Sequence, residues 1–213
     1  MKLPIIIILA ITVIQSYSQS ARIVKIEKGS RKNWAVIIEK QDKSKENYFA
    51  SCYFKNVTML PDSTKISLIE QLLKGIKDTS YCYQPVEALS YRYNGRNNKS
   101  PKSSVYNLQI AALILINYIA LSSEAVVYSP YPVLYDKKGK KEITTAGNDL
   151  DVVIKEYQKW FKKIKQKGFK NFGLPLINTR YEWYGSLFLK QHVFKEVPKW
   201  EKLYDCPILV KEE

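Results

Sequence analysis

The feature that most constrains the fold is an apolar run over residues 108–121, which only Gln109 and Asn117 interrupt. The run is shorter than the roughly 17 residues that a helix needs to span a bilayer. A helix that is apolar on nearly all sides must be surrounded by other elements. We therefore predict a buried central helix over residues 105–122, capped by Ser103 or Ser104, around which the other elements pack.

Two further amphipathic helices are predicted from apolar residues at helical spacing. The first runs to residue 76 and begins at residues 61–63, which we expect to supply its cap. The second spans residues 148–167, with Asn148 as its cap and Gly168 as its end. Its apolar stripe consists of Leu150, Val153, Ile154, Tyr157, Phe161 and Ile164. Lysines cover much of its other side, which we interpret as a solvated face; the alternative is peripheral contact with an anionic membrane.

Strands are predicted from segments rich in β-branched and aromatic residues. Residues 22–28 and 34–40 form one hairpin around a turn at 29–33, and a third strand follows at 48–54. A short second hairpin pairs residues 133–135 with 142–144. No repeat or composition shift marks a second domain, so the sequence predicts a single α+β domain with N-terminal antiparallel strands.

The first 18 residues have the layout of a secretory signal peptide. A positive start is followed by an apolar stretch over residues 3–14 and by small residues that end at Ser18. We expect cleavage near Ser18 and a secreted or periplasmic mature domain over residues 19–213. The alternative is that the apolar stretch stays in place as a membrane anchor.

The mature chain is strongly basic. The full 213 residues carry 34 basic and 20 acidic side chains, a net charge of +14, and removal of Lys2 leaves +13. Long-range attraction draws such a protein to anionic partners. Outside the cytoplasm, nucleic acid is a poor candidate, so we expect an anionic envelope component or an acidic protein. The alternative is that the charge serves solubility alone.

The cysteines and the single histidine point to structure rather than to catalysis. In an oxidising compartment Cys52 and Cys82 are the preferred disulfide partners, although Cys206 could pair with either one. A catalytic thiol would need a neighbouring base, and His192 has no companion motif. The chain also lacks the close ligand spacing of a zinc site and any glycine-rich phosphate loop. The sequence therefore indicates no metal, cofactor or catalytic constellation.

Two segments combine tyrosine, arginine and a turn glycine, at residues 91–96 and 179–185. Tyrosine, tryptophan and arginine dominate protein contact sites because they bury a large area with little loss of entropy. The alternative is that these rings fill the core. The predicted binding residues are Tyr91, Arg92, Tyr93, Arg96, Arg180, Tyr181, Trp183 and Tyr184.

Together these features favour an exported, non-catalytic binding protein, for which a toxin inhibitor or immunity-type protein would be an example. The alternative is a small secreted hydrolase of cell-wall or extracellular polymer that uses carboxylates, with Glu182 as the residue to test. A structural protein of the envelope is a third hypothesis. No pattern in the chain indicates an oligomeric state.

Overall fold

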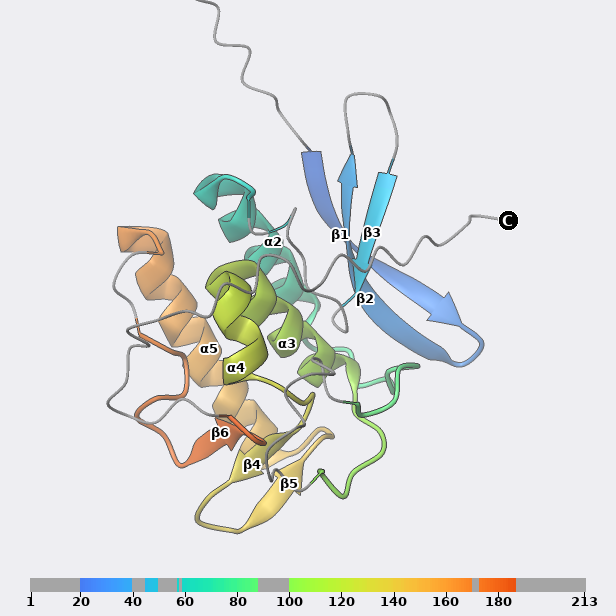
Figure 1. Ribbon diagram of the computed structural model, residues 1–213, viewed down its shortest axis with the longest axis vertical. Helices are drawn as coiled ribbons and strands as arrows, with labels where there is room; N and C mark the ends of the chain where they lie inside the picture. The colour runs from blue at the N-terminus through green and yellow to red at the C-terminus, as the bar shows by residue number, and fades with distance from the viewer. Residues whose placement is uncertain are drawn as a thin grey trace, which may run out of the picture.

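The computed structural model describes residues 20–39, 45–49, 57, 59–87, 100–169 and 173–186. These residues form two antiparallel three-stranded sheets and four α-helices, with strands first in the chain. Figure 1 shows the larger sheet on one side of the helices and the smaller sheet at one end of them. The predicted α+β fold class is confirmed. The predicted signal peptide lies outside the described residues.

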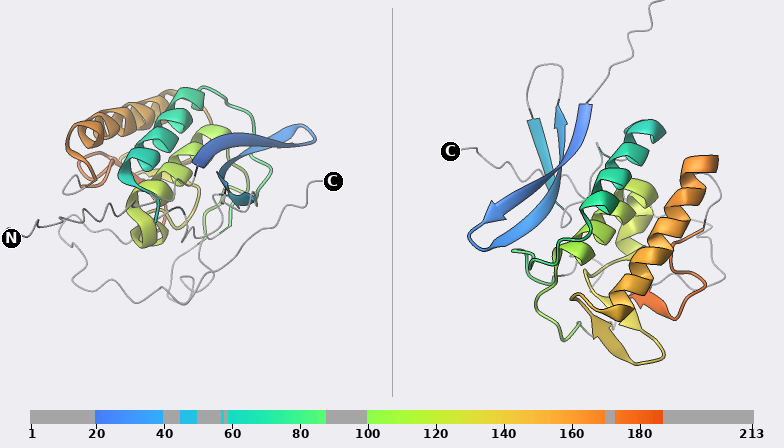
Figure 2. Two further views of the ribbon diagram at one scale, coloured as in Figure 1. Left: turned by 90° about the horizontal axis from the view of Figure 1, so that it is seen from above. Right: turned by 180° about the vertical axis from the view of Figure 1, so that it is seen from behind.

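The central helix α3, Leu108–Leu121, is the hub of the structure. Its first 12 residues are all buried, including the two polar ones, Gln109 and Asn117. Helices α2, Asp62–Gly75, and α5, Asn148–Lys167, contribute their apolar faces to the same core. The three helices lie side by side (Figures 1 and 2). The prediction of a buried hub between two amphipathic helices is confirmed.

The cap of α3 differs from the prediction. The Oδ1 atom of Asn107 accepts the N–H of Ile110 at 3.1 Å, so Asn107 is the cap instead of Ser103 or Ser104. Ser103 instead donates its hydroxyl to Glu142 at 2.6 Å. Several short polar residues precede the helix, and each could cap it equally well. Tertiary pairing decides between them, because residues 81–82 bond to residues 106–107 and hold that stretch extended.

The caps predicted for the other two helices are also wrong. The residues at the cap positions of α2 and α5 are Pro61 and Gly147, and neither gives a side-chain cap hydrogen bond. Instead, acidic residues in the first turns, among them Asp62 and Asp149, stabilise these helices because their negative charge is attracted to the positive end of the helix dipole. Gly168 ends α5 at a φ of +81°, as predicted. The predicted apolar stripe of α5 is entirely buried, and Trp160 joins it.

The larger sheet consists of β1, Ser20–Lys28, β2, Arg31–Glu39, and β3, Lys45–Phe49, in the order β1-β2-β3. The turn between β1 and β2 has only two residues and begins at Gly29, whose φ is +62°. The predicted turn at 29–33 is therefore too long, and β3 begins earlier than predicted; the rest of the predicted third strand, residues 50–54, lies outside the described residues. Polar residues 31–33 belong to β2, where backbone pairing tolerates them.

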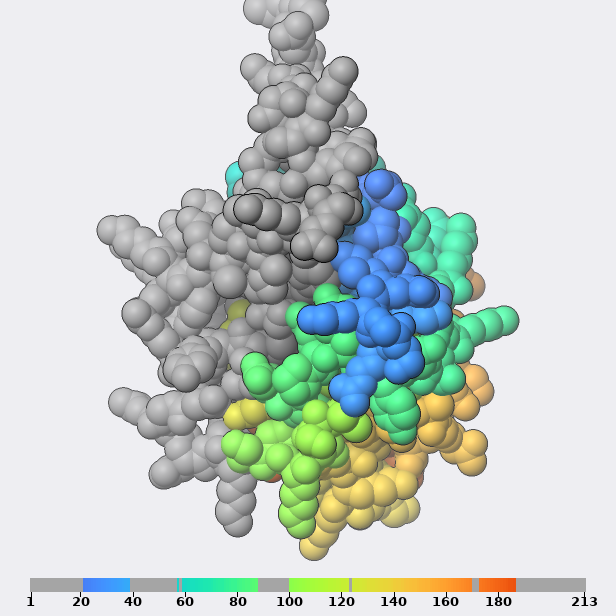
Figure 3. Space-filling view, turned by 90° about the vertical axis from the view of Figure 1, so that its right-hand side faces the viewer, coloured from blue at the N-terminus to red at the C-terminus, as the bar shows by residue number. Residues whose placement is uncertain are grey.

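Trp34 of β2 joins the larger sheet to the helices through a hydrogen bond and close packing. Its indole N–H donates to the Leu108 carbonyl at the start of α3, at 3.0 Å. A Cβ atom at Gly75 of α2 would lie 2.6 Å from the Trp34 ring, so only glycine permits this approach. In the space-filling view the β1–β2 hairpin (blue) borders the teal and green segments that follow it in the chain (Figure 3).

The smaller sheet combines the predicted hairpin with a strand from much later in the chain. It consists of β4, Leu134–Asp136, β5, Lys141–Ile143, and β6, Tyr181–Trp183, in the order β5-β4-β6. Between α3 and this sheet the chain passes through the 3-10 helix η2, Ser122–Glu124, and the short helix α4, Ala125–Tyr128. The sheet brings the second predicted binding segment against the hairpin.

Candidate functional site

The structure places the predicted binding residues of the second segment in different environments. Arg180 is exposed, and Tyr184 is half-buried. Tyr181 and Trp183 are 3% and 0% exposed, so both rings lie in the core. The first segment, with Tyr91, Arg92, Tyr93 and Arg96, lies outside the described residues. Partner binding by these residues stays a prediction, and in the second segment it depends on the side chains of Arg180 and Tyr184, which flank β6.

The inner face of β6 forms a buried polar chain with two helices. Trp183 donates its indole N–H to the Tyr157 hydroxyl at 2.9 Å, and Tyr157 donates to Asn117 Oδ1 at 2.7 Å. Burial raises the pKa of Tyr157 well above its usual value, so the phenol stays neutral. Among the described residues, the Nδ2 group of Asn117 has no hydrogen-bond partner. This chain, which links β6, α5 and α3, stabilises the core.

Arg180 takes part in an ion-pair cluster at the start of α5. Its Nη2 atom lies 2.7 Å from Asp149 Oδ1, and its Nε atom lies 3.4 Å from the buried Asp136. Lys141 contacts the other oxygen of Asp149 at 2.5 Å, and the Tyr181 hydroxyl donates to Asp149 at 2.9 Å. The bond from Lys141, followed by that from Tyr181, lowers the Asp149 pKa to about 2. The protein's own carboxylates therefore already neutralise the Arg180 charge.

The outer face of the smaller sheet carries two carboxylates beside an aromatic ring. In the strand register Tyr135 is paired with Glu142 on one side and Glu182 on the other, so all three share one face. Tyr184 packs edge-on against Tyr135, with ring centroids 5.9 Å apart. The side chain of Glu182 is 46% exposed, and its carboxylate lies 3.7 Å from the Lys137 ammonium. The register thus places Glu182, the residue to test for a hydrolase, on the same sheet face as a second acid, with β4 between them.

Glu142 is held in place by the segment before α3. It accepts the N–H groups of Lys102 and Ser103 at 2.7 and 2.8 Å, besides the Ser103 hydroxyl. Burial acts to raise the Glu142 pKa, but these bonds outweigh it, and the pKa is lowered. Glu142 is therefore ionised at neutral pH and suits the role of a base rather than an acid.

Cys82 is buried with a free thiol, and burial raises its pKa, which disfavours a nucleophilic thiolate. The other predicted disulfide residue, Cys52, lies outside the described residues, as do Cys206 and His192. The disulfide stays a prediction. In the described part of the chain, no group of three or more histidine, cysteine or acidic residues could hold a metal ion.

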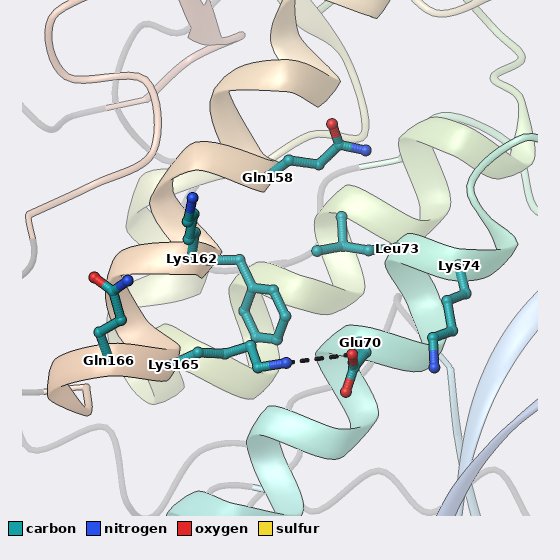
Figure 4. A pocket seen from close by; sticks show the side chains of 8 residues that line it. Glu70, Leu73, Lys74, Gln158, Lys162, Lys165 and Gln166 are labelled. Atoms are coloured by element: carbon teal, nitrogen blue, oxygen red, sulfur yellow. Dashed lines mark hydrogen bonds and ion pairs between the residues drawn. The ribbon is translucent and has the colours of Figure 1, made fainter.

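A groove of about 450 Å³ lies between α2 and α5. It exists because both helices bury their apolar stripes in the common core, which leaves a seam between their outer edges. Figure 4 shows Leu73 and Gln158 on facing sides of this seam. We call it the α2–α5 groove; its lining residues are Glu70, Leu73, Lys74, Gln158, Phe161, Lys162, Lys165 and Gln166.

The α2–α5 groove is positively charged above an apolar floor. Leu73 and Phe161 form the floor, and the lining includes three lysines but only one carboxylate. Lys165 lies 3.3 Å from Glu70 across the seam (Figure 4) and 5.9 Å from the centroid of the Phe161 ring. Within the described residues, Lys74 and Lys162 have no ion-pair partner. The groove therefore keeps a net positive charge that its own residues do not neutralise.

No family model, curated protein or solved structure matches this chain. Among the described helices, none is both long enough and apolar enough to cross a membrane. Function is therefore argued from the site itself.

Sequence patterns alone do not reveal the α2–α5 groove. The lysines of α5 were recognised but were interpreted as a solvated face, and their neighbours on α2 lie far away in the chain. The Lys165–Glu70 pair, for example, joins residues 95 positions apart. Helical periodicity shows which edge of a helix is polar, but it does not show which other helix lies beside that edge. No local signal could have identified this groove.

Proposed function

We propose that this is an exported, non-catalytic protein that binds an anionic partner through the α2–α5 groove. The observation that carries the proposal is the placement of Lys74, Lys162 and Lys165 around an apolar floor, with one carboxylate among them. Unpaired lysines at a concave surface attract anionic groups and steer their approach. An anionic envelope component and an acidic protein both remain within this proposal, and a toxin inhibitor or immunity-type protein would belong to it.

Other exposed charges support this choice of site. Seven of the described acidic residues are already in ion pairs: Glu27, Glu70, Asp78, Asp136, Asp149, Glu156 and Glu182. On α5, by contrast, Lys155, Lys162, Lys163 and Lys167 have no ion-pair partner among the described residues. Part of the expected positive charge of the mature chain thus lies unpaired on α5, where Lys162 lines the groove. Export itself rests on the sequence of residues 1–18.

The test compares two triple variants with the same change in charge. One is Lys74→Gln, Lys162→Gln and Lys165→Gln; the control is Lys28→Gln, Lys102→Gln and Lys138→Gln, which lie on other exposed surfaces. Binding to polyglutamate and to vesicles rich in phosphatidylglycerol is measured by titration at several salt concentrations. We expect the groove variant to lose about tenfold in affinity for at least one probe, and the control to lose about threefold or less.

An equal loss in both variants would show that attraction follows net charge alone, and it would overturn the proposal. Thermal unfolding of each variant serves as the folding control. Because all six side chains are exposed, we expect both melting temperatures to stay close to that of the wild type.

A second candidate function is the hydrolysis of an extracellular polymer by carboxylates. The observation that favours it is the row of Glu142, Tyr135 and Glu182 on one face of the smaller sheet. Neighbouring strands lie about 4.8 Å apart. Because β4 lies between the strands that carry the two acids, their backbones are roughly 10 Å apart, and a sugar could bind between the two side chains. The wild type and Glu182→Gln would be incubated with purified peptidoglycan and with acidic polysaccharide. Release of reducing ends by the wild type alone would establish this candidate.

A further inference from the structure

We infer that the α2–α5 groove receives an acidic amphipathic helix from a protein partner. This inference rests on the proposed function and names the class of anionic partner. It follows from two properties that occur together in the groove, an apolar floor and a basic rim on both sides. Each property restricts the occupant in a different way.

The apolar floor selects an occupant with apolar side chains. Leu73 on α2 is half-buried and exposes carbon surface at the bottom of the seam, whereas Phe161 on α5 is 6% exposed and adds only a small part of its ring. A polyanion such as polyglutamate has no apolar group to cover this surface. A flat bilayer surface meets the lysines at the rim but does not enter a seam between two helices. A segment with an apolar ridge can do both.

The basic rim selects carboxylates on both flanks of that ridge. Lys74 belongs to α2, whereas Lys162 and Lys165 belong to α5, so positive charge borders the floor from two sides. In an amphipathic helix, apolar residues at positions i, i+3, i+4 and i+7 form one stripe with polar residues on either side. Such a helix with acidic flanks matches the groove in both charge and polarity.

The shape of the groove also suits a helix. The helices α2 and α5 have 14 and 20 residues and lie beside each other (Figures 1 and 2). Residues 70–74 of α2 face residues 158–166 of α5 across the seam, so the groove is about two helical turns long on the α5 side. Glu70 does not block an acidic occupant, because Lys165 already pairs with it. An incoming carboxylate can share Lys165, and the amides of Gln158 and Gln166 provide neutral hydrogen-bond donors at the rim.

The test uses three synthetic peptides and the full chain. The first peptide is a helix with leucines at i, i+3, i+4 and i+7 and glutamates on both flanks. The second has the same composition in an order that breaks the leucine stripe, and the third replaces glutamate with lysine. We expect the first peptide to bind about tenfold more tightly than the second, and the third not to bind.

Variants of the protein locate the contact. Leu73→Ala should lower affinity for the striped peptide about fivefold, whereas Ile177→Ala, at a comparably exposed apolar residue elsewhere, should leave it unchanged. Lys162→Gln with Lys165→Gln should weaken the striped peptide about tenfold. Hydrogen exchange should slow in α2 and α5 when this peptide binds.

The two proposals can fail separately. If the striped and unstriped peptides bind equally and both need the groove lysines, the helix inference is overturned while anionic binding stands. Binding to phosphatidylglycerol vesicles through these lysines, without binding to the striped peptide, would also overturn it and would identify a membrane contact. If no anionic probe depends on the groove lysines, both proposals fail.

Discussion

The inner face of β6 and the α2–α5 groove combine aromatic rings with positive charge in opposite ways. At β6 the rings of Tyr181 and Trp183 are buried, and the charge of Arg180 is neutralised by Asp149 and Asp136. In the groove, the Phe161 ring forms part of the floor while two of the three lysines have no ion-pair partner among the described residues. The first arrangement stabilises the protein, and the second leaves charge available to a partner.

Clustering of residue types in the sequence does not identify a binding surface. The segment around Arg180 looks like a contact site because tyrosine, tryptophan and arginine are adjacent in it. In a strand, however, alternate residues point to opposite faces, so Tyr181 and Trp183 turn inward together. The lysines of α5 are spread along a helix and form a rim only beside α2. Pairing and burial, rather than residue type, distinguish the two regions.

The largest effect we predict is for Trp183→Ala. The substitution removes a fully buried ring and its hydrogen bond to Tyr157, so the free energy of unfolding should fall by about 3–5 kcal/mol. Lys162→Gln in the groove is the contrasting variant. Urea unfolding followed by circular dichroism measures both. If the free energy of unfolding falls no more for Trp183→Ala than for Lys162→Gln, the β6 region does not stabilise the protein more than the groove does.

A smaller effect is predicted for Tyr157→Phe. The ring remains, but the indole N–H of Trp183 loses its acceptor and Asn117 Oδ1 loses its donor. Leaving buried polar groups without partners costs about 1–3 kcal/mol, and we expect a loss of stability in that range. Tyr81→Phe is the matched control, because Tyr81 is 52% exposed, and its unfolding curve should match that of the wild type.

Asp149→Asn tests the ion-pair cluster through pH. Since the folded-state pKa of Asp149 is lowered to about 2, its contribution to stability is complete above the unfolded-state value of about 4 and is lost as pH falls toward 2. The variant should be less stable than the wild type at pH 7, and the two should converge in that acid window. Melting temperatures at pH 7, 4 and 2 provide the measurement; a constant difference would contradict the pairing.

The smallest effect concerns Lys162→Gln alone. The side chain is exposed and has no ion-pair partner among the described residues, so the change in unfolding free energy should stay within about 0.5 kcal/mol. In the same protein sample, affinity for an anionic probe should fall and depend less on salt. If the variant loses stability but keeps its affinity, Lys162 has a structural role and does not contribute to binding.

Strong periodic patterns made much of the fold predictable. The apolar run at 108–121, the stripe of α5 and the turn glycine at 168 each depend on neighbours within one or two helical turns, and the structure confirms them. Local signals failed where several residues compete for one role. Asn107 caps α3, although Ser103 and Ser104 are equally suitable by type, and residues 31–33 extend a strand although their polarity indicates a turn.

The candidate site was less predictable than the fold. The lysines of α5 are visible in the sequence, but the pairing of Glu182 with Tyr135 and the ion pair of Lys165 with Glu70 join segments far apart in the chain. Both depend on how elements pack, which no local spacing records. Likewise, the burial of Trp183 follows from its strand's place beside β4 rather than from its neighbours in sequence.

The amino-acid sequence alone determined the helices, their apolar faces and the excess of positive charge, because these depend on residue type and short-range spacing. Only the tertiary structure decided which charges are neutralised and which remain available, since α2 meets α5, and β6 meets the β4–β5 hairpin, through contacts between distant segments. Hydrophobic burial drives those contacts without regard to charge. At β6 the charge of Arg180 is therefore paired, whereas in the groove only Lys165 of the three lysines has an ion-pair partner among the described residues.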